Sequence, residues 1–369
     1  MVQFLLSVGA KKVPVLACAI VLTISVSLPG WALGHKQKAR PLVPPPEILL
    51  EGGRKLAFEA SFQSERDVKT KPGFWTKALN FVAGEPEYKR MARPYSIAVD
   101  SRGREIITDP GMGGVHIFDF EKHKYKFLSR PDAGKDPMLA PQCVAVDAED
   151  NIYVTDSDTG KIFIFDPNGK LRHVLGSLRG GEGYFKRPTG IAVDSVGRRI
   201  YITDTLRDKV FVMDMEGNVL NSIGAKGTGN LEFNFPTELL LHDHTLFVVD
   251  TMNFRIQMLS INGEFKGSIG QIGDEVGGLF RPKGVAIDSE GHLYIVDALF
   301  NAVQIFDEEG SLLYYFGGSG SDLGRFRLPA GIFIDKRDRV YVADSYNRRV
   351  QVFRYTGVSH QPVGTGAQK

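Results

Sequence analysis

Short apolar runs separated by turn residues recur along most of the chain. Each copy of the pattern starts at a proline, passes through an apolar run such as the "GIAV" of residues 190–193, turns, and ends a second run on an aspartate. Valine, isoleucine and aromatic residues fill the runs, and Gly, Asp and Ser bound them, which is the pattern of short β-strands. Six prolines mark the copies: Pro94, Pro141, Pro188, Pro236, Pro282 and Pro329.

The copies return at a nearly constant spacing of roughly 40 to 50 residues, which is typical of stacked structural repeats. Each copy holds enough apolar runs for four strands, and a four-stranded repeat of this kind is the blade of a β-propeller. The sequence therefore predicts an all-β fold over residues 51–356, a six-bladed β-propeller of four-stranded antiparallel blades.

Several short sequence motifs within the copies resemble those of the NHL repeat family. They are "GIAVD", "IYVTD", "NRRVQVFR" and a closing Gly-x-Leu-x-x-x-(Phe/Ile)-Gly, and they recur over about three quarters of the chain. The resemblance implies a propeller of six blades.

The last copy stops at Tyr355 without an outermost strand, and the tail after it cannot supply one. Far upstream, "KLAFEASF" places Leu56, Phe58, Ala60 and Phe62 on one face of a strand. We expect this N-terminal strand to pair with the last blade and close the ring. Before the first full copy, apolar residues at helical spacing predict a short amphipathic helix. They are Phe74, Trp75, Ala78, Leu79 and Val82.

Residues 1–34 have the pattern of a signal peptide, because Lys11 and Lys12 precede an apolar stretch that small residues follow. An uncleaved segment would instead anchor the protein in the inner membrane, since its length is near the minimum for a span. Residues 35–50 are basic and then proline-rich, which predicts an extended linker, and we expect residues 357–369 to be a disordered tail. The sequence thus predicts an exported bacterial protein, periplasmic or secreted, with an anchored form as the alternative.

Charge argues against nucleic acid as a partner. Residues 1–34 hold two lysines and no acid, so 43 of the 45 basic residues remain to balance 43 acidic ones. Affinity for phosphate needs concentrated Lys and Arg, which a neutral chain does not provide. Cys143 is the one cysteine after residue 34, which excludes an intramolecular disulfide in the mature protein.

Two sets of aspartates recur in the copies. The set that ends the second run suggests a metal or catalytic ring, but Asp also accepts hydrogen bonds from turn amides, and we favour this structural role. This set is Asp109, Asp156, Asp204, Asp250, Asp297 and Asp344. A cation five positions later predicts a repeated ion pair, at Lys161, Lys209, Arg255 and Arg349. The second set closes the first run and is expected to cap the next turn: Asp100, Asp147, Asp194, Asp288 and Asp335.

Large apolar residues distinguish the loops that follow the second strand. In an antiparallel blade, these loops and the start of the innermost strand open on the same face of the ring. The apolar residues in the loops are Leu206, Met252, Phe254, Leu299, Phe300 and Tyr346. A contiguous apolar patch marks an interaction surface. The alternative is that the connectors between blades cover these side chains.

The residue two after each proline is expected at the mouth of the central channel. These residues are Ser96, Cys143, Gly190, Glu238, Gly284 and Gly331. Glu238 is the one acid among them, and burial can raise the pKa of such a carboxyl until it serves in proton transfer or metal binding. The alternative is a solvated rim residue. Glu238 is thus a candidate catalytic residue, and Cys143 a candidate ligand-binding residue.

Histidines gather on the opposite face. His242 and His244 share one turn, and His292 lies in the matching turn of the next copy. Three imidazoles are enough ligands for a catalytic zinc, although turns of neighbouring blades diverge outward. Propellers similar to this one include peptide-amidating lyases with metal-bound histidines and lactonases that hold calcium, but neither ligand pattern is present residue by residue. We expect no cofactor, with Ca²⁺ or Zn²⁺ as the alternatives.

The sequence favours a monomeric binding or scaffold propeller that displays its loops to a protein, peptide or glycan of the cell envelope. A rigid ring fixes the loops, so little ordering entropy is lost on binding. The alternative is a hydrolase or lyase with a metal-assisted site at the channel mouth near Glu238. Nucleophile-elbow, Walker and paired-cysteine motifs do not occur in the sequence, so we lean against an enzyme.

Overall fold

The computed structural model describes residues 47–50, 53–69, 87–129, 137–178 and 183–357. The chain divides into two units, Met1–Val43 and Pro44–Lys369, and every described residue belongs to the second. The predicted signal or anchor segment, the linker up to residue 46, the predicted helix at residues 74–82 and the tail after residue 357 lie outside the described residues. None of the helices in the described ranges is long and apolar enough to cross a membrane.

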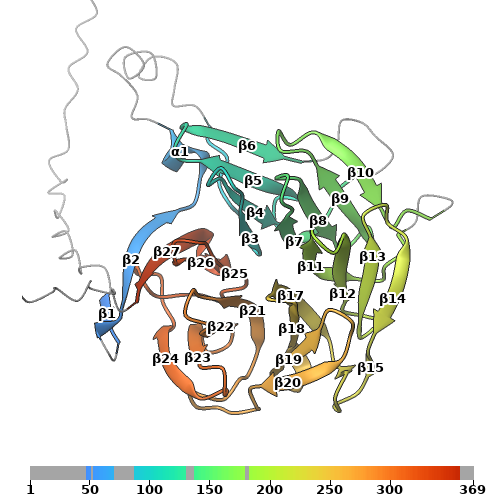
Figure 1. Cartoon of the computed structure of the whole chain (residues 1–369). Helices are drawn as coiled ribbons and strands as arrows, with labels where there is room; N and C mark the ends of the chain where they lie inside the picture. Colours follow the sequence, from blue (N-terminus) through green and yellow to red (C-terminus); the bar gives the residue numbers. More distant parts are fainter. Residues whose placement is uncertain (1–46, 51–52, 70–86, 130–136, 179–182, 358–369) are drawn as a thin grey trace, which may run out of the picture. The chain divides into compact units, whose positions relative to one another are not determined.

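Six antiparallel sheets form the blades of a propeller, numbered here from one to six along the chain (Figure 1). Blade one is β3 (Ile97–Val99), β4 (Glu105–Asp109), β5 (Gly114–Asp119) and β6 (Lys124–Leu128). Blade two is β7 (Pro141–Val146), β8 (Ile152–Asp156), β9 (Lys161–Phe165) and β10 (Leu171–Leu175). Blade three is β11 (Pro188–Asp194), β12 (Arg199–Asp204), β13 (Lys209–Asp214) and β14 (Val219–Ile223).

The second half of the ring repeats this order. Blade four is β17 (Pro236–His242), β18 (Thr245–Asp250), β19 (Arg255–Ser260) and β20 (Phe265–Ile269). Blade five is β21 (Pro282–Ile287), β22 (Leu293–Asp297), β23 (Ala302–Phe306) and β24 (Leu312–Gly317). Blade six begins with β25 (Ile332–Ile334), β26 (Arg339–Asp344) and β27 (Arg349–Thr356). The first strand of each blade contacts the first strands of both neighbouring blades, so these strands line the channel. The predicted six-bladed, all-β propeller is confirmed.

Several short elements lie outside the strands of the blades. Two helical turns, η2 (Thr251–Asn253) and η3 (Ser345–Asn347), follow the second strands of blades four and six. A parallel pair, β15 (Ala225–Lys226) and β16 (Glu232–Phe233), lies in the connector between blades three and four. One further helical turn, α1 (Glu65–Val68), precedes the first full blade.

An N-terminal strand closes the ring as predicted. Strand β2 (Lys55–Phe62) pairs antiparallel with β27, with Leu56 opposite Tyr355 and Phe62 opposite Val350. The linker prediction was too long by several residues, because β1 (Glu47–Leu49) pairs with β2 and adds a fifth strand to blade six. Blade six therefore combines both ends of the propeller sequence.

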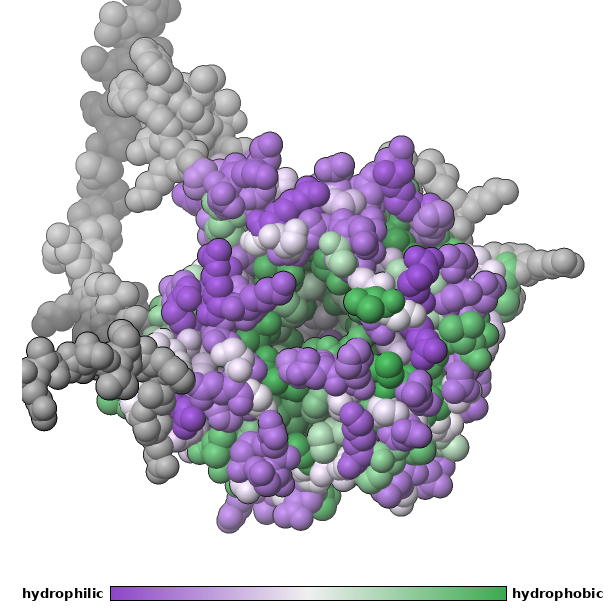
Figure 2. Space-filling view, viewed as in Figure 1, coloured by the Kyte–Doolittle hydropathy of each residue, from purple (hydrophilic) through white to green (hydrophobic). Residues whose placement is uncertain are grey.

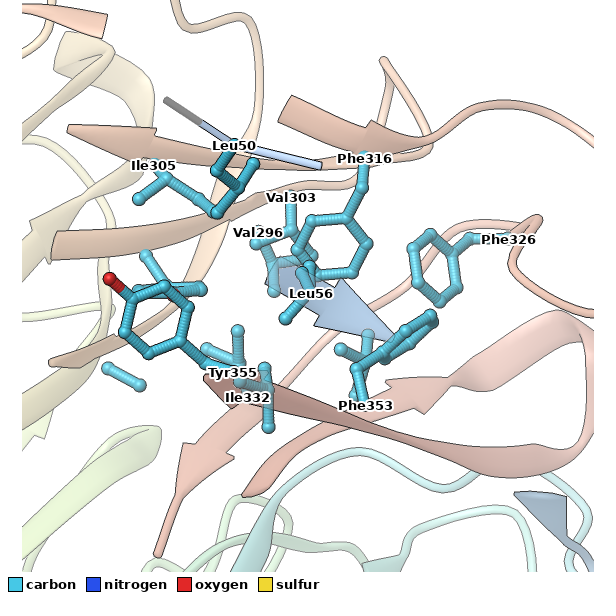
Figure 3. Packing of buried hydrophobic residues seen from close by; sticks show 14 residues of the cluster. Leu50, Leu56, Val296, Val303, Ile305, Phe316, Phe326, Ile332, Phe353 and Tyr355 are labelled. Atoms are coloured by element: carbon cyan, nitrogen blue, oxygen red, sulfur yellow. The ribbon is translucent and has the colours of Figure 1, made fainter. Parts of the chain in front are cut away.

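The apolar core fills the spaces between neighbouring blades. Leu56 of β2 lies among Phe316 of blade five and Phe353 of blade six (Figure 3). One large apolar residue from each described connector also enters this core and is at most 3% exposed. These connector residues are Phe185, Phe233, Leu279 and Phe326.

The recurrent aspartates are structural, as favoured from the sequence. Each carboxylate that ends a second strand is fully buried and accepts hydrogen bonds from the connector that leads into its own blade, as from the Arg187 amide to Asp204 at 3.0 Å. The predicted ion pair forms at Arg255–Asp250, 3.0 Å, and at Arg349–Asp344, 2.7 Å. The first-strand aspartates cap the turns that follow them through backbone amides.

Hydroxyl groups join successive blades near the channel. The hydroxyl of Thr205 donates to the carbonyl oxygen of Pro236 at 2.7 Å, and that of Thr251 donates to Pro282 at 3.0 Å. The hydroxyl of Ser345 donates to the carbonyl oxygen of Pro94 and so links blade six to blade one. These bonds hold the starts of the innermost strands at fixed positions on one face of the ring.

Candidate functional site

The apolar loop residues remain exposed at the surface. The exposed fractions of Leu206, Met252, Leu299 and Tyr346 are 47%, 48%, 44% and 64%. The connectors therefore do not cover these four side chains, whereas Phe254 and Phe300 are partly buried. Phe300 is half-buried and makes an edge contact with Phe280 of the connector, with ring centroids 6.5 Å apart.

A cavity of about 510 Å³ opens where the innermost strands begin, and we call it the mouth cavity. Residues from the loops after the second strands line it together with residues that flank the prolines, so these two groups share a face of the ring as expected. Its apolar lining is Phe235, Met252, Phe254, Phe280 and Leu299, and its cationic lining is Arg187, Arg281 and Lys283. Figure 2 shows apolar surface around the central opening of the ring and mostly hydrophilic surface farther out.

The structure brings only some of the predicted residues to this cavity. Met252 and Leu299 line it, whereas Leu206, Phe300 and Tyr346 do not. Cys143 is 1% exposed and does not line the cavity either. The loop residues predicted to form one apolar patch are therefore divided. Met252 and Leu299, from blades four and five, belong to the cavity wall.

Buried aspartates fix the connector residues of the mouth cavity. Asp297 accepts hydrogen bonds from the backbone amides of Phe280 and Arg281, at 2.7 and 3.0 Å. The amide of Phe235 donates to Asp208 at 2.9 Å. Because the backbone is held in this way, the side chains face the cavity from preset positions.

Glu238 lies behind the cavity lining, beside Cys143. Gly190 separates the two along the ring, and a Cβ atom on Gly190 would lie 2.8 Å from the Cα of Glu238. The absence of a side chain at Gly190 thus allows this close approach between blades three and four. The Oε2 atom of Glu238 is enclosed and makes no hydrogen bond with any described residue.

Burial shifts the ionisation of both groups. Burial raises the pKa of Glu238 to about 7, although a hydrogen bond from the Cys143 thiol and the charge of Lys283 act in the opposite direction. Burial and the neighbouring Glu238 raise the pKa of Cys143 well above its usual value. The thiol therefore stays protonated, and Glu238 is the group able to exchange a proton near neutral pH.

The cations of the mouth cavity repel one another. Burial and the charges of Arg281 and Arg187 lower the pKa of Lys283 to about 8. The pKa of Tyr95, another lining residue, is raised mainly by burial, so its hydroxyl remains a hydrogen-bond donor. The mouth cavity thus combines an apolar wall with a concentration of positive charge.

The three candidate zinc ligands are not brought together. His242 borders a cavity between blades four and five, whereas His292 borders a separate cavity beside Tyr355. His292 Nδ1 lies 2.9 Å from Asp288 Oδ2, so a turn-capping carboxylate holds this ring. Within the described ranges, no group of three or more His, Cys, Asp or Glu side chains, His244 included, is placed to hold a metal ion.

Most lining residues were not identified from the sequence, among them Lys283 and four residues that stand just before the repeat prolines. Phe235, Arg187 and Arg281 directly precede the repeat prolines, and Phe280 stands one position earlier. A signal for them does exist, because an Arg-Pro pair recurs in alternate copies at residues 93, 187 and 281.

Comparison with known proteins agrees with this architecture. A family model described as a 6-bladed beta-propeller matches residues 144–217 and 191–271. These matches span blades two to four and agree with the six-bladed fold of the structure. The NHL repeat model matches residues 326–353, the last of the copies in which the sequence resembles this family. No curated protein matches the chain.

Solved structures share the fold at low sequence identity. Virginiamycin B lyase from Staphylococcus aureus is 14% identical, with 82% of this chain and 99% of that chain covered and a TM-score of 0.54. A gluconolactonase from Xanthomonas campestris is 15% identical, with 86% and 99% covered and a TM-score of 0.56. An auxiliary nutrient binding protein from Bacteroides thetaiotaomicron is 14% identical, with 72% and 70% covered and a TM-score of 0.56. At such identities the likeness establishes the fold alone.

Proposed function

We propose that this protein is a binding module that holds the apolar part of a ligand in the mouth cavity. The preformed cavity of about 510 Å³ carries the proposal, because its size is that of small-molecule sites and aromatic side chains line it. The fixed backbone of the lining supports binding at little cost in ordering entropy. A nutrient binding protein shares the fold. A location outside the cytoplasm stays a prediction from the N-terminal sequence.

The apolar wall is tested with 1-pyrenebutanol, a neutral fluorescent probe. The wild-type protein is expected to bind it. The double variant Met252→Ser/Leu299→Ser is expected to bind at least about tenfold more weakly, since the probe loses its apolar contacts with these two side chains. Fluorescence titration measures both dissociation constants.

A matched control removes two apolar side chains elsewhere. Val196 and Leu220 are 93% and 55% exposed and do not line the cavity, so Val196→Ser/Leu220→Ser should bind like the wild type. Equal affinity of all three proteins, or no binding by any of them, would contradict the proposed site.

Proton transfer at Glu238 is a second candidate function. The enclosed, unpaired Oε2 atom and the pKa of about 7 favour it, because a general base works best when its pKa lies near the working pH. The corresponding activity is that of a hydrolase or lyase with its site at the channel mouth, beside the mouth cavity.

Hydrolysis of dihydrocoumarin, an aromatic lactone suited to the apolar wall, tests this candidate. The rate should rise with pH through about 7 as Glu238 ionises, and Glu238→Gln should lower kcat/KM at least about 100-fold. Burial also raises the pKa of Glu105 to about 7, but Glu105 lies between blades one and six, so Glu105→Gln is the control. Unchanged turnover in Glu238→Gln would exclude this mechanism.

A further inference from the structure

We propose that the ligand of the mouth cavity is a small organic acid, whose carboxylate is bound by Arg187, Arg281 and Lys283 while its apolar body packs on the apolar wall. This inference rests on the proposed binding function and assigns the chemical class of the ligand. It predicts that a negative charge on an otherwise apolar molecule strengthens binding.

The three cationic side chains make no salt bridge within the described residues, and Glu238 is the carboxyl group whose charge acts on Lys283. No ion pair or hydrogen bond joins any of them to another side chain in the described part of the protein. Other arginines of the same repeats are paired, since Arg255 and Arg349 lie 3.0 and 2.7 Å from their aspartates. Arg187, Arg281 and Lys283 thus bring three cations without a salt bridge to one cavity, where a ligand can supply the opposite charge.

The fold holds two of these cations in place without neutralising them. The backbone amides of Arg187 and Arg281 donate to Asp204 and Asp297, each at 3.0 Å. The carboxylates therefore fix the main chain, and the guanidinium groups remain available for a ligand. A guanidinium group presents paired N–H donors that match the two oxygens of a carboxylate.

The carboxyl group of Glu238 does not balance this positive charge. Glu238 lies behind the lining, and burial keeps its pKa near 7, so much of it is neutral at neutral pH. The pKa of Lys283 is lowered to about 8, mainly by burial and further by the charges of Arg281 and Arg187, while Glu238 acts only weakly in the opposite direction. An incoming anion would relieve this repulsion.

The apolar wall selects an organic acid rather than an inorganic anion. Met252, Phe280 and Leu299 are between 43% and 48% exposed and border the same cavity as the cations. Phe254 and Phe280 stand with ring centroids 6.3 Å apart, which forms an aromatic surface beside the charged group. A cavity of about 510 Å³ accommodates a molecule with a ring system or short chain and one acidic group.

The experiment compares 1-pyrenebutyrate with 1-pyrenebutanol, two probes with the same apolar body. The wild-type protein is expected to bind the carboxylate at least about tenfold more tightly than the alcohol. The double variant Arg187→Gln/Arg281→Gln should lose this preference and bind the alcohol as before. Fluorescence titrations at pH 7 give the four dissociation constants, and far-UV circular dichroism checks the fold of the variant.

The control variant Arg172→Gln/Arg198→Gln removes the same charge away from the mouth cavity, and the two side chains are 54% and 69% exposed. It should keep the preference for the carboxylate. Equal affinity of the wild-type protein for both probes, or a preference that survives in Arg187→Gln/Arg281→Gln, would overturn the inference and leave the binding function intact. If neither probe binds the wild-type protein, both the inference and the proposed binding function are overturned.

Discussion

Replacing Asp344 with alanine is expected to lower the free energy of unfolding by about 3–5 kcal/mol, because the change leaves a buried cation without its partner. Asp344 is fully buried and accepts the Nε–H of Arg349 at 2.7 Å, and the side chain of Arg349 is only 12% exposed. The same carboxylate accepts the amide of Arg327 at 2.8 Å and the side-chain amides of Asn347 and Gln351.

Urea unfolding followed by far-UV circular dichroism measures this effect. The control is Asp243→Ala, because the side chain of Asp243 is 93% exposed, and we expect a change within about 0.5 kcal/mol there. A loss of less than about 1 kcal/mol in Asp344→Ala would show that the connector does not depend on the buried carboxylate.

Leu56→Ala is expected to destabilise the ring by about 2–5 kcal/mol, since it removes buried methyl groups and leaves a cavity. Leu56 is 1% exposed and packs with Phe316 and Phe353 at the junction between blades five and six. Because Leu56 lies in the strand that closes the ring, we expect its replacement to weaken the packing of blade five against blade six.

Leu49→Ala is the matched control for this prediction. Leu49 lies in β1 of the same blade but is 78% exposed, so its replacement should change stability by less than about 0.5 kcal/mol. The midpoint of thermal unfolding compares both variants with the wild type. Equal midpoints for Leu56→Ala and Leu49→Ala would mean that β2 contributes little to the ring.

The fold could be predicted from the sequence because each blade has its own local pattern of apolar and turn residues. Alternating apolar residues indicated the strands, the repeat prolines indicated the number of blades, and the missing outer strand after Tyr355 indicated closure by residues 55–62. The end of the linker was misplaced, since three residues after a run of prolines, Glu47–Leu49, carry too short a pattern to reveal a strand.

The candidate site was only partly predictable, because residues from five blades line the cavity. Met252 and Leu299 departed from the repeat and could be singled out one by one. Arg187 and Arg281 looked like ordinary charged residues next to a proline, and only the geometry of the ring places them in one cavity. The contact between Cys143 and Glu238 likewise depends on the spacing of blades at Gly190.

The closing strand also has a consequence for how the chain folds. Glu59 of β2 and Arg354 of β27 form an ion pair although they stand 295 positions apart in sequence. A contact of this separation carries a large loop-closure entropy, and topologies dominated by such contacts fold slowly. During synthesis β2 emerges long before its partner, so its hydrogen-bonding edge and apolar face stay unpaired until blade six is complete. The rate of ring closure therefore determines how long the unfinished protein is open to aggregation.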